Sequence, residues 1–161
     1  MYKKIKLLRE YGWVKKNLSI QKGSNKRLDE LHAGILNIKL DYLDQFNNKR
    51  ILIANQYLKK IKSKKLILPK INLLKKHVFH LFVVRIRNNK RNSFLKYLKR
   101  NKIYAGIHYP LPNHLQKPFL TYNKTKLFIT EKISKEIVSI PNYPLLSFKE
   151  INKIIKVINN F

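Results

Sequence analysis

A run of apolar and aromatic residues near the middle of the chain limits the fold more than any other feature. Residues 77–86 have the sequence HVFHLFVVRI, and this density of β-branched and aromatic side chains is typical of a well-buried strand. Segments 103–107 and 138–141 are also expected to be strands, while 13–24 and 62–76 are expected to be irregular. Helical spacing follows each strand. The sequence therefore predicts an α+β fold with a small, mostly antiparallel sheet and helices on one face.

Six segments have apolar residues at the spacing of a helix. They are 2–9, 28–43, 48–61, 94–101, 128–134 and the segment after Ser147, with 28–43 and 48–61 forming either two consecutive helices or one bent helix. Gly12 is expected to end the first helix in the left-handed conformation. Ser24 or Asn25 is expected to cap the second. Ser147 and Glu150 have the spacing of a capping box for the last one.

A loop with two prolines carries the candidate ligand contacts. Residues 108–114 have the sequence HYPLPNH, and the prolines keep this segment out of regular structure. Stiff loops with polar aromatic groups often line ligand pockets. We therefore consider His108, Tyr109 and His114 as candidate contacts, with a purely structural role as the open alternative.

The residue types limit the chemistry that the chain can perform. It has no cysteine, which excludes disulfides, thiol nucleophiles and cysteine-ligated metals. The five histidines lack the companions of a metal site or a catalytic triad, and there is no glycine-rich phosphate loop. No acidic residue lies between Asp44 and Glu131, so carboxylate acid–base chemistry could use only the two ends of the chain. We expect no metal site.

The charge of the chain raises the possibility of nucleic-acid binding. Its 36 Lys and Arg against 8 Asp and Glu give a formal net charge of +28, and such residues neutralise phosphates. Of the 36, however, 29 are Lys spread over the whole chain, whereas nucleic-acid proteins more often use Arg with interleaved aromatic residues on one surface. With 20 Ile and 17 Asn, this bias is typical of an A- and T-rich genome. No specific nucleic acid is expected as a partner.

No segment approaches the length of a membrane span, which needs about 18 to 20 consecutive apolar residues. The first ten residues, MYKKIKLLRE, lack the apolar run of a signal peptide. With 161 residues the chain is one domain at most. We expect a soluble, cytoplasmic protein without a membrane partner.

One further segment has the character of an anion site. Residues 23–27, GSNKR, precede an expected helix, and backbone N–H groups at such a place together with the Asn25 amide could bind an anion. Capping of the helix explains Asn25 equally well without any ligand. The residues alone leave both readings open.

Five segments of the chain form a distinctive series of motifs: 7–12 (LLREYG), 23–36 (GSNKRLDELHAGIL), 77–83 (HVFHLFV), 106–116 (GIHYPLPNHLQ) and 140–144 (IPNYP). In this order they resemble the DegT/DnrJ/EryC1/StrS family of sugar aminotransferases that use pyridoxal 5′-phosphate. The resemblance covers nearly the whole chain. His32 and Gly34 depart from the Gln and Ala that the family usually has at these positions.

The resemblance implies a fold-type I enzyme that works as a homodimer with active sites at the subunit boundary. Such enzymes move an amino group from an amino acid such as glutamate to a keto-sugar nucleotide, for example dTDP-3-keto-6-deoxyhexose. By position, Asn25 matches an interface asparagine that reaches the cofactor phosphate bound in the neighbouring subunit. His108 and Tyr109 match the loop that borders the sugar-nucleotide pocket.

The resemblance also implies a division of the chain. The family's Schiff-base lysine and its large cofactor-binding domain precede the segment that resembles residues 7–12, and the three lysines before residue 7 come too late to replace that lysine. We expect residues 1–62 to be an interface loop with helices, and 63–161 a small α+β domain like the C-terminal small domain of the family. The large domain and the catalytic lysine are then absent.

Such a chain is expected to be a C-terminal fragment or a split subunit of a nucleotide-sugar aminotransferase, inactive alone. Its expected partner is a separately encoded large-domain chain, or a second copy as in the family's homodimer, together with the nucleotide-sugar substrate. Binding of the cofactor by this chain alone is not expected. The alternative is a basic module that binds nucleic acid or another partner and evolved from the remnant.

Overall fold

The computed structural model describes residues 1–71, 76–119 and 126–161. The chain forms two compact units, residues 1–43 and 44–161, and each is described by itself. The expected division at residue 62, between an interface segment and a small domain, stays a prediction.

The first unit contains two helices and a short hairpin. Helix α1 (Tyr2–Arg9) leads into strands β1 (Trp13–Lys15) and β2 (Leu18–Ser19), which pair antiparallel, and helix α2 (Glu30–Asp41) follows. The hairpin lies in segment 13–24, which the sequence predicts to be irregular. The prediction misses it because strands of three and two residues leave almost no periodicity to detect. As expected, Gly12 follows α1 with a φ of +73°.

Helix α2 begins later than the sequence predicts. Asp29 is its N-cap, and Asp29 Oδ1 accepts hydrogen bonds from the backbone N–H groups of Leu31 (2.9 Å) and His32 (3.3 Å). The prediction of Ser24 or Asn25 as the cap is therefore wrong. Pairing explains the difference, since Asn25 forms an antiparallel bridge with Glu10 and its backbone stays extended.

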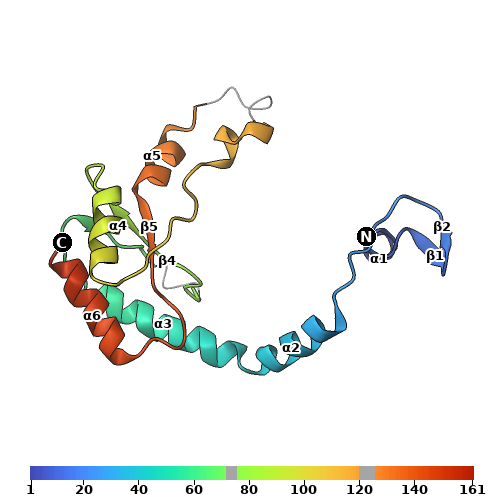
Figure 1. Cartoon of the computed structure of the whole chain (residues 1–161), viewed down its shortest axis with the longest axis horizontal. Coiled ribbons are helices and arrows are strands. Elements are labelled where there is room, and N and C mark those ends of the chain that lie inside the picture. The colour runs from blue at the N-terminus through green and yellow to red at the C-terminus, as the bar shows by residue number, and fades with distance from the viewer. Residues whose placement is uncertain (72–75, 120–125) are drawn as a thin grey trace. The chain divides into compact units, whose positions relative to one another are not determined.

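The second unit is a layer of helices on a three-stranded sheet. Helix α3 (Leu43–Lys60), which runs across the boundary of the two units, precedes strand β3 (Leu66–Ile67) and strand β4 (Phe82–Ile86). Helix α4 (Arg91–Arg100) and the 3₁₀ turns η1 (Asn113–Leu115) and η2 (Lys117–Phe119) come next. Helix α5 (Phe128–Glu136), strand β5 (Ile137–Ile140) and helix α6 (Phe148–Asn159) complete the unit. Figure 1 shows α3, α4 and α6 gathered around β4 and β5.

The sheet is antiparallel with the order β3-β4-β5. Its outer strand β3 lies in the expected connection 62–76, of which residues 72–75 are outside the described residues. The expected strand 103–107 is wrong in its extent, since only Gly106 forms a bridge, with Ser139. The expected strand 77–86 is shorter than predicted because Phe79 has a φ of +50°, which interrupts extended structure.

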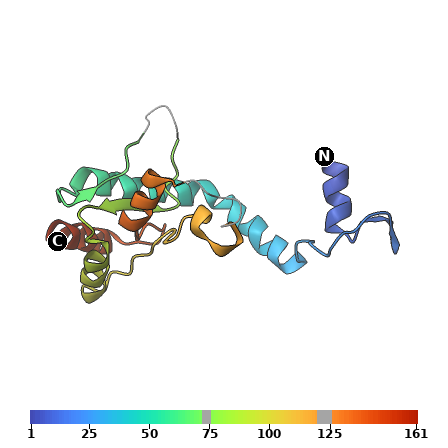
Figure 2. The ribbon, with the colours of Figure 1, turned by 90° about the horizontal axis from the view of Figure 1, so that it is seen from above.

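The core lies on one side of the sheet. Phe82, Val84 and Ile86 alternate along β4 and are fully buried, while Val83 and Arg85 between them are half-buried. Helices α3, α4 and α6 supply buried side chains to the same core, among them Tyr57 and Phe94. This arrangement confirms the predicted α+β fold with helices on one face. Helices α3 and α6 lie side by side in both views (Figures 1 and 2).

The last helix begins as its sequence predicts. Ser147 Oγ accepts a hydrogen bond from the backbone N–H of Glu150, and a Glu150 carboxylate oxygen accepts one from the backbone N–H of Ser147 at 2.8 Å. This capping box lowers the pKa of Glu150, chiefly through the bond with the Ser147 side chain. The predicted cap is confirmed.

Candidate functional site

The residues singled out from the sequence fall in both units. Asn25 belongs to the first unit, whereas His108, Tyr109 and His114 belong to the loop between α4 and α5 of the second. Each group therefore has its contacts within its own unit.

Asn25 lies on a short extended segment that is attached to the end of α1. The backbone N–H of Ser24 donates to the carbonyl of Leu8 at 2.9 Å, and that of Lys26 donates to the carbonyl of Arg9 at 3.0 Å. These two bonds hold the backbone of Asn25 between them, and its side chain is exposed. A depression of about 360 Å³ lies alongside, lined by Ile5, Leu8, Arg9, Ser24 and Lys26.

The chemistry around Asn25 suits an anion. Arg27 Nε donates to Asn25 Oδ1 at 3.4 Å, and within the described ranges no residue hydrogen-bonds to the amide nitrogen Nδ2. Two N–H donors of Nδ2 thus stay available, with Lys26 and Arg27 as the next residues in the chain. The Arg9 guanidinium is paired with the Glu10 carboxylate at 3.2 Å. Amide and cationic donors of this kind can hydrogen-bond to phosphate oxygens.

His108 is held by the sheet. Its ring nitrogen Nδ1 lies 2.9 Å from Oγ of Ser139, a residue of β5 that is 6% exposed. The backbones of Gly106 and Ser139 exchange two hydrogen bonds of 3.0 and 2.8 Å, which fix the start of the loop against the strand. Together these contacts place an exposed imidazole on a rigid support.

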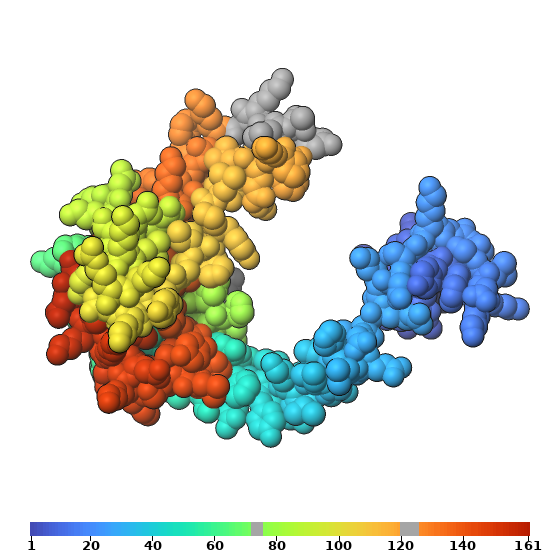
Figure 3. All heavy atoms as spheres, viewed as in Figure 1, coloured from blue at the N-terminus to red at the C-terminus, as the bar shows by residue number. Residues whose placement is uncertain are grey.

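Tyr109 follows His108 and is 73% exposed, with its ring centroid 5.7 Å from that of His108. The two rings meet edge to face. In Figure 3 the amber segment that contains this loop lies at the surface of the second unit. The structure thus brings His108 and Tyr109 together in an accessible position.

His114 has a structural contact. Its Nε2 lies 3.2 Å from Oε1 of Glu131 on α5, and its side chain is 10% exposed. The hydrogen bond with His114 and a second one from the backbone N–H of Leu127 lower the pKa of the Glu131 carboxyl. This pair attaches the loop to α5, so the structural alternative for His114 is the one that the contacts favour.

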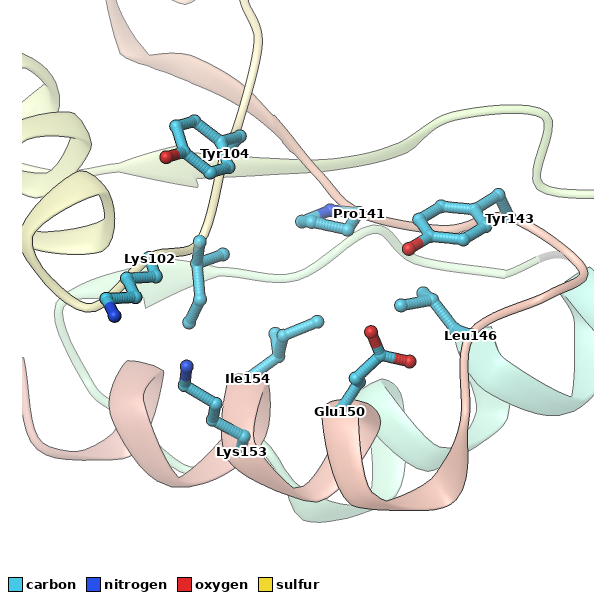
Figure 4. A pocket seen from close by; sticks show the side chains of 9 residues that line it. Lys102, Tyr104, Pro141, Tyr143, Leu146, Glu150, Lys153 and Ile154 are labelled. Carbon is cyan, nitrogen blue, oxygen red and sulfur yellow. The ribbon is translucent and has the colours of Figure 1, made fainter.

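Two features of the second unit could not be predicted from the sequence. The sequence predicts only that Ser139 belongs to a strand, although a polar residue inside the apolar run VSIP is a signal for a specific contact. No sequence pattern indicates the hollow in Figure 4, which has a volume of about 340 Å³. It is lined by Lys102, Ile103, Tyr104, Pro141, Tyr143, Leu146, Glu150, Lys153 and Ile154, and it includes none of Asn25, His108, Tyr109 and His114.

In residues 1–71, 76–119 and 126–161 no three His, Asp or Glu side chains gather as they would around a metal ion. Over the same ranges no helix has the length and apolar character that a bilayer crossing needs.

Comparison with known proteins decides the family. Residues 1–159 match the DegT/DnrJ/EryC1/StrS aminotransferase family. The chain belongs to this family. A dTDP-3-amino-3,6-dideoxy-alpha-D-galactopyranose transaminase of Aneurinibacillus thermoaerophilus is 42% identical over 158 residues, which cover 98% of this chain and 43% of the relative.

Solved structures of aminotransferases share the fold. DesV of S. venezuelae, solved with a ketimine intermediate, matches 99% of this chain and 43% of its own with a TM-score of 0.90 and 28% identity. The Bacillus subtilis protein ntda, solved with bound cofactor PMP, matches 96% of this chain and 38% of its own with a TM-score of 0.85 and 25% identity. The chain spans under half the length of these family members.

Proposed function

We propose that this chain forms the small domain and the interface segment of a nucleotide-sugar aminotransferase. The observation that carries the proposal is the 42% identity, over 98% of this chain, to a transaminase that is named for a dTDP-linked 3-amino-3,6-dideoxy sugar. The proposed reaction moves the amino group of glutamate to the keto carbon of a dTDP-linked 3-keto-6-deoxyhexose. The alternative of a basic nucleic-acid module gains no support from these relatives.

Residues 1–62 are proposed as the interface part. In the first unit only Gly12 is buried, while apolar side chains of α2 such as Leu31 and Ile38 are 73% and 65% exposed. A unit that buries no apolar side chain of its own lacks the main source of folding free energy. This exposure supports a role for the segment in contact with other parts of an enzyme, either a second copy or a separate large-domain chain.

Pyridoxal 5′-phosphate is the proposed cofactor, and the Asn25 region fits one part of it. The available Nδ2 donors of Asn25 and the nearby cations of Lys26 and Arg27 suit the phosphate group. When bound, the cofactor supplies an aldehyde that accepts the amino group of the donor and passes it to the sugar. In the proposal, the lysine that holds it comes from the large domain.

In the proposed enzyme this chain positions the two ligands and contributes no reacting group. Asn25 would bind the cofactor phosphate in the neighbouring subunit. His108 and Tyr109 would border the sugar-nucleotide pocket, the first as a hydrogen-bonding group and the second as an exposed ring that excludes water from one side. Their attachment to β5 through Gly106 and Ser139 supports this role, because a rigid wall orients a substrate better than a free loop.

The experiment that tests the proposal is a chimeric enzyme. Residues 1–159 of this chain replace the matching part of the Aneurinibacillus thermoaerophilus transaminase, and the purified protein is given pyridoxal 5′-phosphate, glutamate and the dTDP-linked keto sugar. We expect formation of the amino sugar and of 2-oxoglutarate in equal amounts, and none from the chain alone. A chimera that folds and retains the cofactor but transfers no amino group would contradict the proposal.

The role of Asn25 has its own test in the same chimera. Asn25→Ala is expected to weaken cofactor binding by about tenfold, the effect of losing a hydrogen bond to a charged group. Asn152→Ala is the matched control, since Asn152 is an exposed asparagine of α6, outside the proposed interface part. Equal cofactor affinity of the two variants would remove Asn25 from the proposed site.

A further inference from the structure

The contact between His108 and Ser139 fixes the position of the histidine and also the direction of a hydrogen bond. Ser139 Oγ, 2.9 Å from Nδ1, is the only side-chain hydrogen-bond partner of His108 in the described part of the chain. The serine comes from the sheet and the histidine from the loop, 31 residues apart. The hydroxyl therefore holds the ring to the rigid part of the unit.

The hydrogen bond has a direction that can be worked out from its surroundings. A serine hydroxyl can donate one hydrogen bond and accept others, while a neutral imidazole has one donor and one acceptor nitrogen. Ser139 is 6% exposed, and among the described residues its Oγ has no acceptor other than His108 Nδ1. If Nδ1 carried the proton, the buried hydroxyl hydrogen would be left without an acceptor, which is costly.

The arrangement that satisfies both groups has the Ser139 hydroxyl donating to Nδ1. In that tautomer the proton of the neutral ring is on Nε2. No residue within the described ranges contacts Nε2 through a hydrogen bond, and His108 is exposed. The second nitrogen is therefore an N–H donor that is available to an oxygen of a ligand.

The backbone confines the same ring from another side. A Cβ atom added to Gly106 would lie 3.0 Å from Cε1 of His108, so the ring lies against this glycine. Gly106 in turn is bonded to Ser139 by two backbone hydrogen bonds. The hydroxyl and the glycine together leave the ring little freedom to turn.

From these contacts we infer that Ser139 is a positioning residue, which sets the tautomer and orientation of His108 so that Nε2–H donates to an oxygen of the nucleotide-sugar substrate. The inference rests on the proposed function for the identity of the ligand. Its structural part, the direction of the hydrogen bond, stands on the contacts of this chain alone.

The structural part is tested by NMR on the chain with ¹⁵N-labelled histidine, at about pH 8.5, where ordinary imidazoles are neutral. His108→Gln assigns the signals. We expect Nδ1 of His108 to show the shift of an unprotonated, hydrogen-bonded nitrogen and Nε2 that of a protonated one. Ser139→Ala should move both signals toward the values of an imidazole that exchanges between its two neutral tautomers. Ser139→Thr, which keeps the hydroxyl, should restore the original signals.

Ser134→Ala is the matched control. Ser134 is 8% exposed like Ser139, but its hydroxyl donates to the carbonyl of Glu131 within α5. This variant should leave the His108 signals unchanged. A protonated Nδ1 in the unmodified chain, or His108 signals that do not respond to Ser139→Ala, would overturn the inference.

The substrate part is tested by kinetics in the chimeric enzyme. Ser139→Ala is expected to raise KM for the nucleotide sugar by about tenfold with little change in KM for glutamate. An equal rise in KM for both substrates would show a merely structural role of Ser139 and overturn this part. If the unmodified chimera transfers no amino group, the proposed function fails instead, and the NMR result still decides the hydrogen bond.

Discussion

The side chain of Asn142 holds the backbone of Phe79 across the end of the sheet. Asn142 Nδ2 donates to the carbonyl oxygen of Phe79 at 2.7 Å, between residues 63 positions apart in the chain. Asn142 is 8% exposed, and Phe79 has a φ of +50°. The buried amide thus stabilises a backbone conformation that an L-residue rarely adopts, three residues before β4 begins at Phe82.

Removing this donor should destabilise the second unit. Asn142→Asp keeps the size of the side chain but places a carboxylate oxygen against the carbonyl of Phe79, so we expect a loss of about 3 kcal/mol in the free energy of unfolding. Urea denaturation followed by circular dichroism measures it. Asn152→Asp, on the exposed side of α6, is the control and should change stability by under about 0.5 kcal/mol. Similar losses in both variants would contradict the role of Asn142.

Two glycines of the first unit should respond to alanine in opposite ways. At Gly12 the φ is +73° and an added Cβ would lie 1.9 Å from the carbonyl oxygen of Gln21, so Gly12→Ala should open the turn after α1. At Gly34, inside α2, an added Cβ meets nothing within 4 Å, and Gly34→Ala should stabilise the helix by about 1 kcal/mol. Amide hydrogen exchange should become faster around residue 12 in the first variant and slower in α2 in the second. Faster exchange in α2 of Gly34→Ala would refute the second expectation.

The pair of His114 and Glu131 makes the stability of the second unit depend on pH in the acidic range. Because its hydrogen bonds lower the pKa of Glu131 in the folded chain, its contribution is present above the unfolded pKa and is lost as the pH falls through the lower folded value. Glu131→Gln should therefore destabilise the chain at pH 7, and the difference from the unmodified chain should shrink below about pH 4. Urea denaturation across this range measures it.

A double-mutant cycle with His114→Gln separates this pair from general charge effects. The effect of Glu131→Gln should be clearly smaller when His114 is absent. Additive effects of the two substitutions would show that the contact contributes nothing to stability.

Tyr57 should limit stability at the alkaline end. It is fully buried, its hydroxyl donates to the carbonyl of Pro141 at 2.8 Å, and burial is the main reason that its pKa is raised. A raised folded pKa gives stability that is complete below the unfolded value of about 10 and declines as the pH rises toward the folded one. Tyr57→Phe should cost about 1 kcal/mol at pH 8 and progressively less above about pH 10.

Tyr97→Phe is the comparison for this prediction. Its hydroxyl also donates to a backbone carbonyl, that of Val157 at 3.1 Å, but the residue is only half-buried. At pH 8 it should cost less free energy of unfolding than Tyr57→Phe, because its surroundings are partly open to water. A Tyr57→Phe effect that stays constant up to pH 11 would rule out the buried hydroxyl as the cause.

Features that depend on neighbours within one or two helical turns could be predicted from the sequence. The capping box of Ser147 and Glu150 was predicted correctly because helix geometry brings residues three apart together wherever the helix lies. The same holds for α1, for the glycine turn after it and for the fold class, which follows from the periodicity of whole segments. The five motifs likewise identified the family, since they are local patterns.

Contacts between residues far apart in the chain could not be predicted in this way. Strand β3 has two residues and no periodicity of its own, and it forms because its backbone pairs with the edge of β4. The cap of α2 moved to Asp29 because Asn25 pairs with Glu10. The bond between His108 and Ser139 depends on the register that sets Gly106 beside β5. Such contacts follow from the packing of the whole unit, because chain spacing alone does not determine which strands and loops become neighbours.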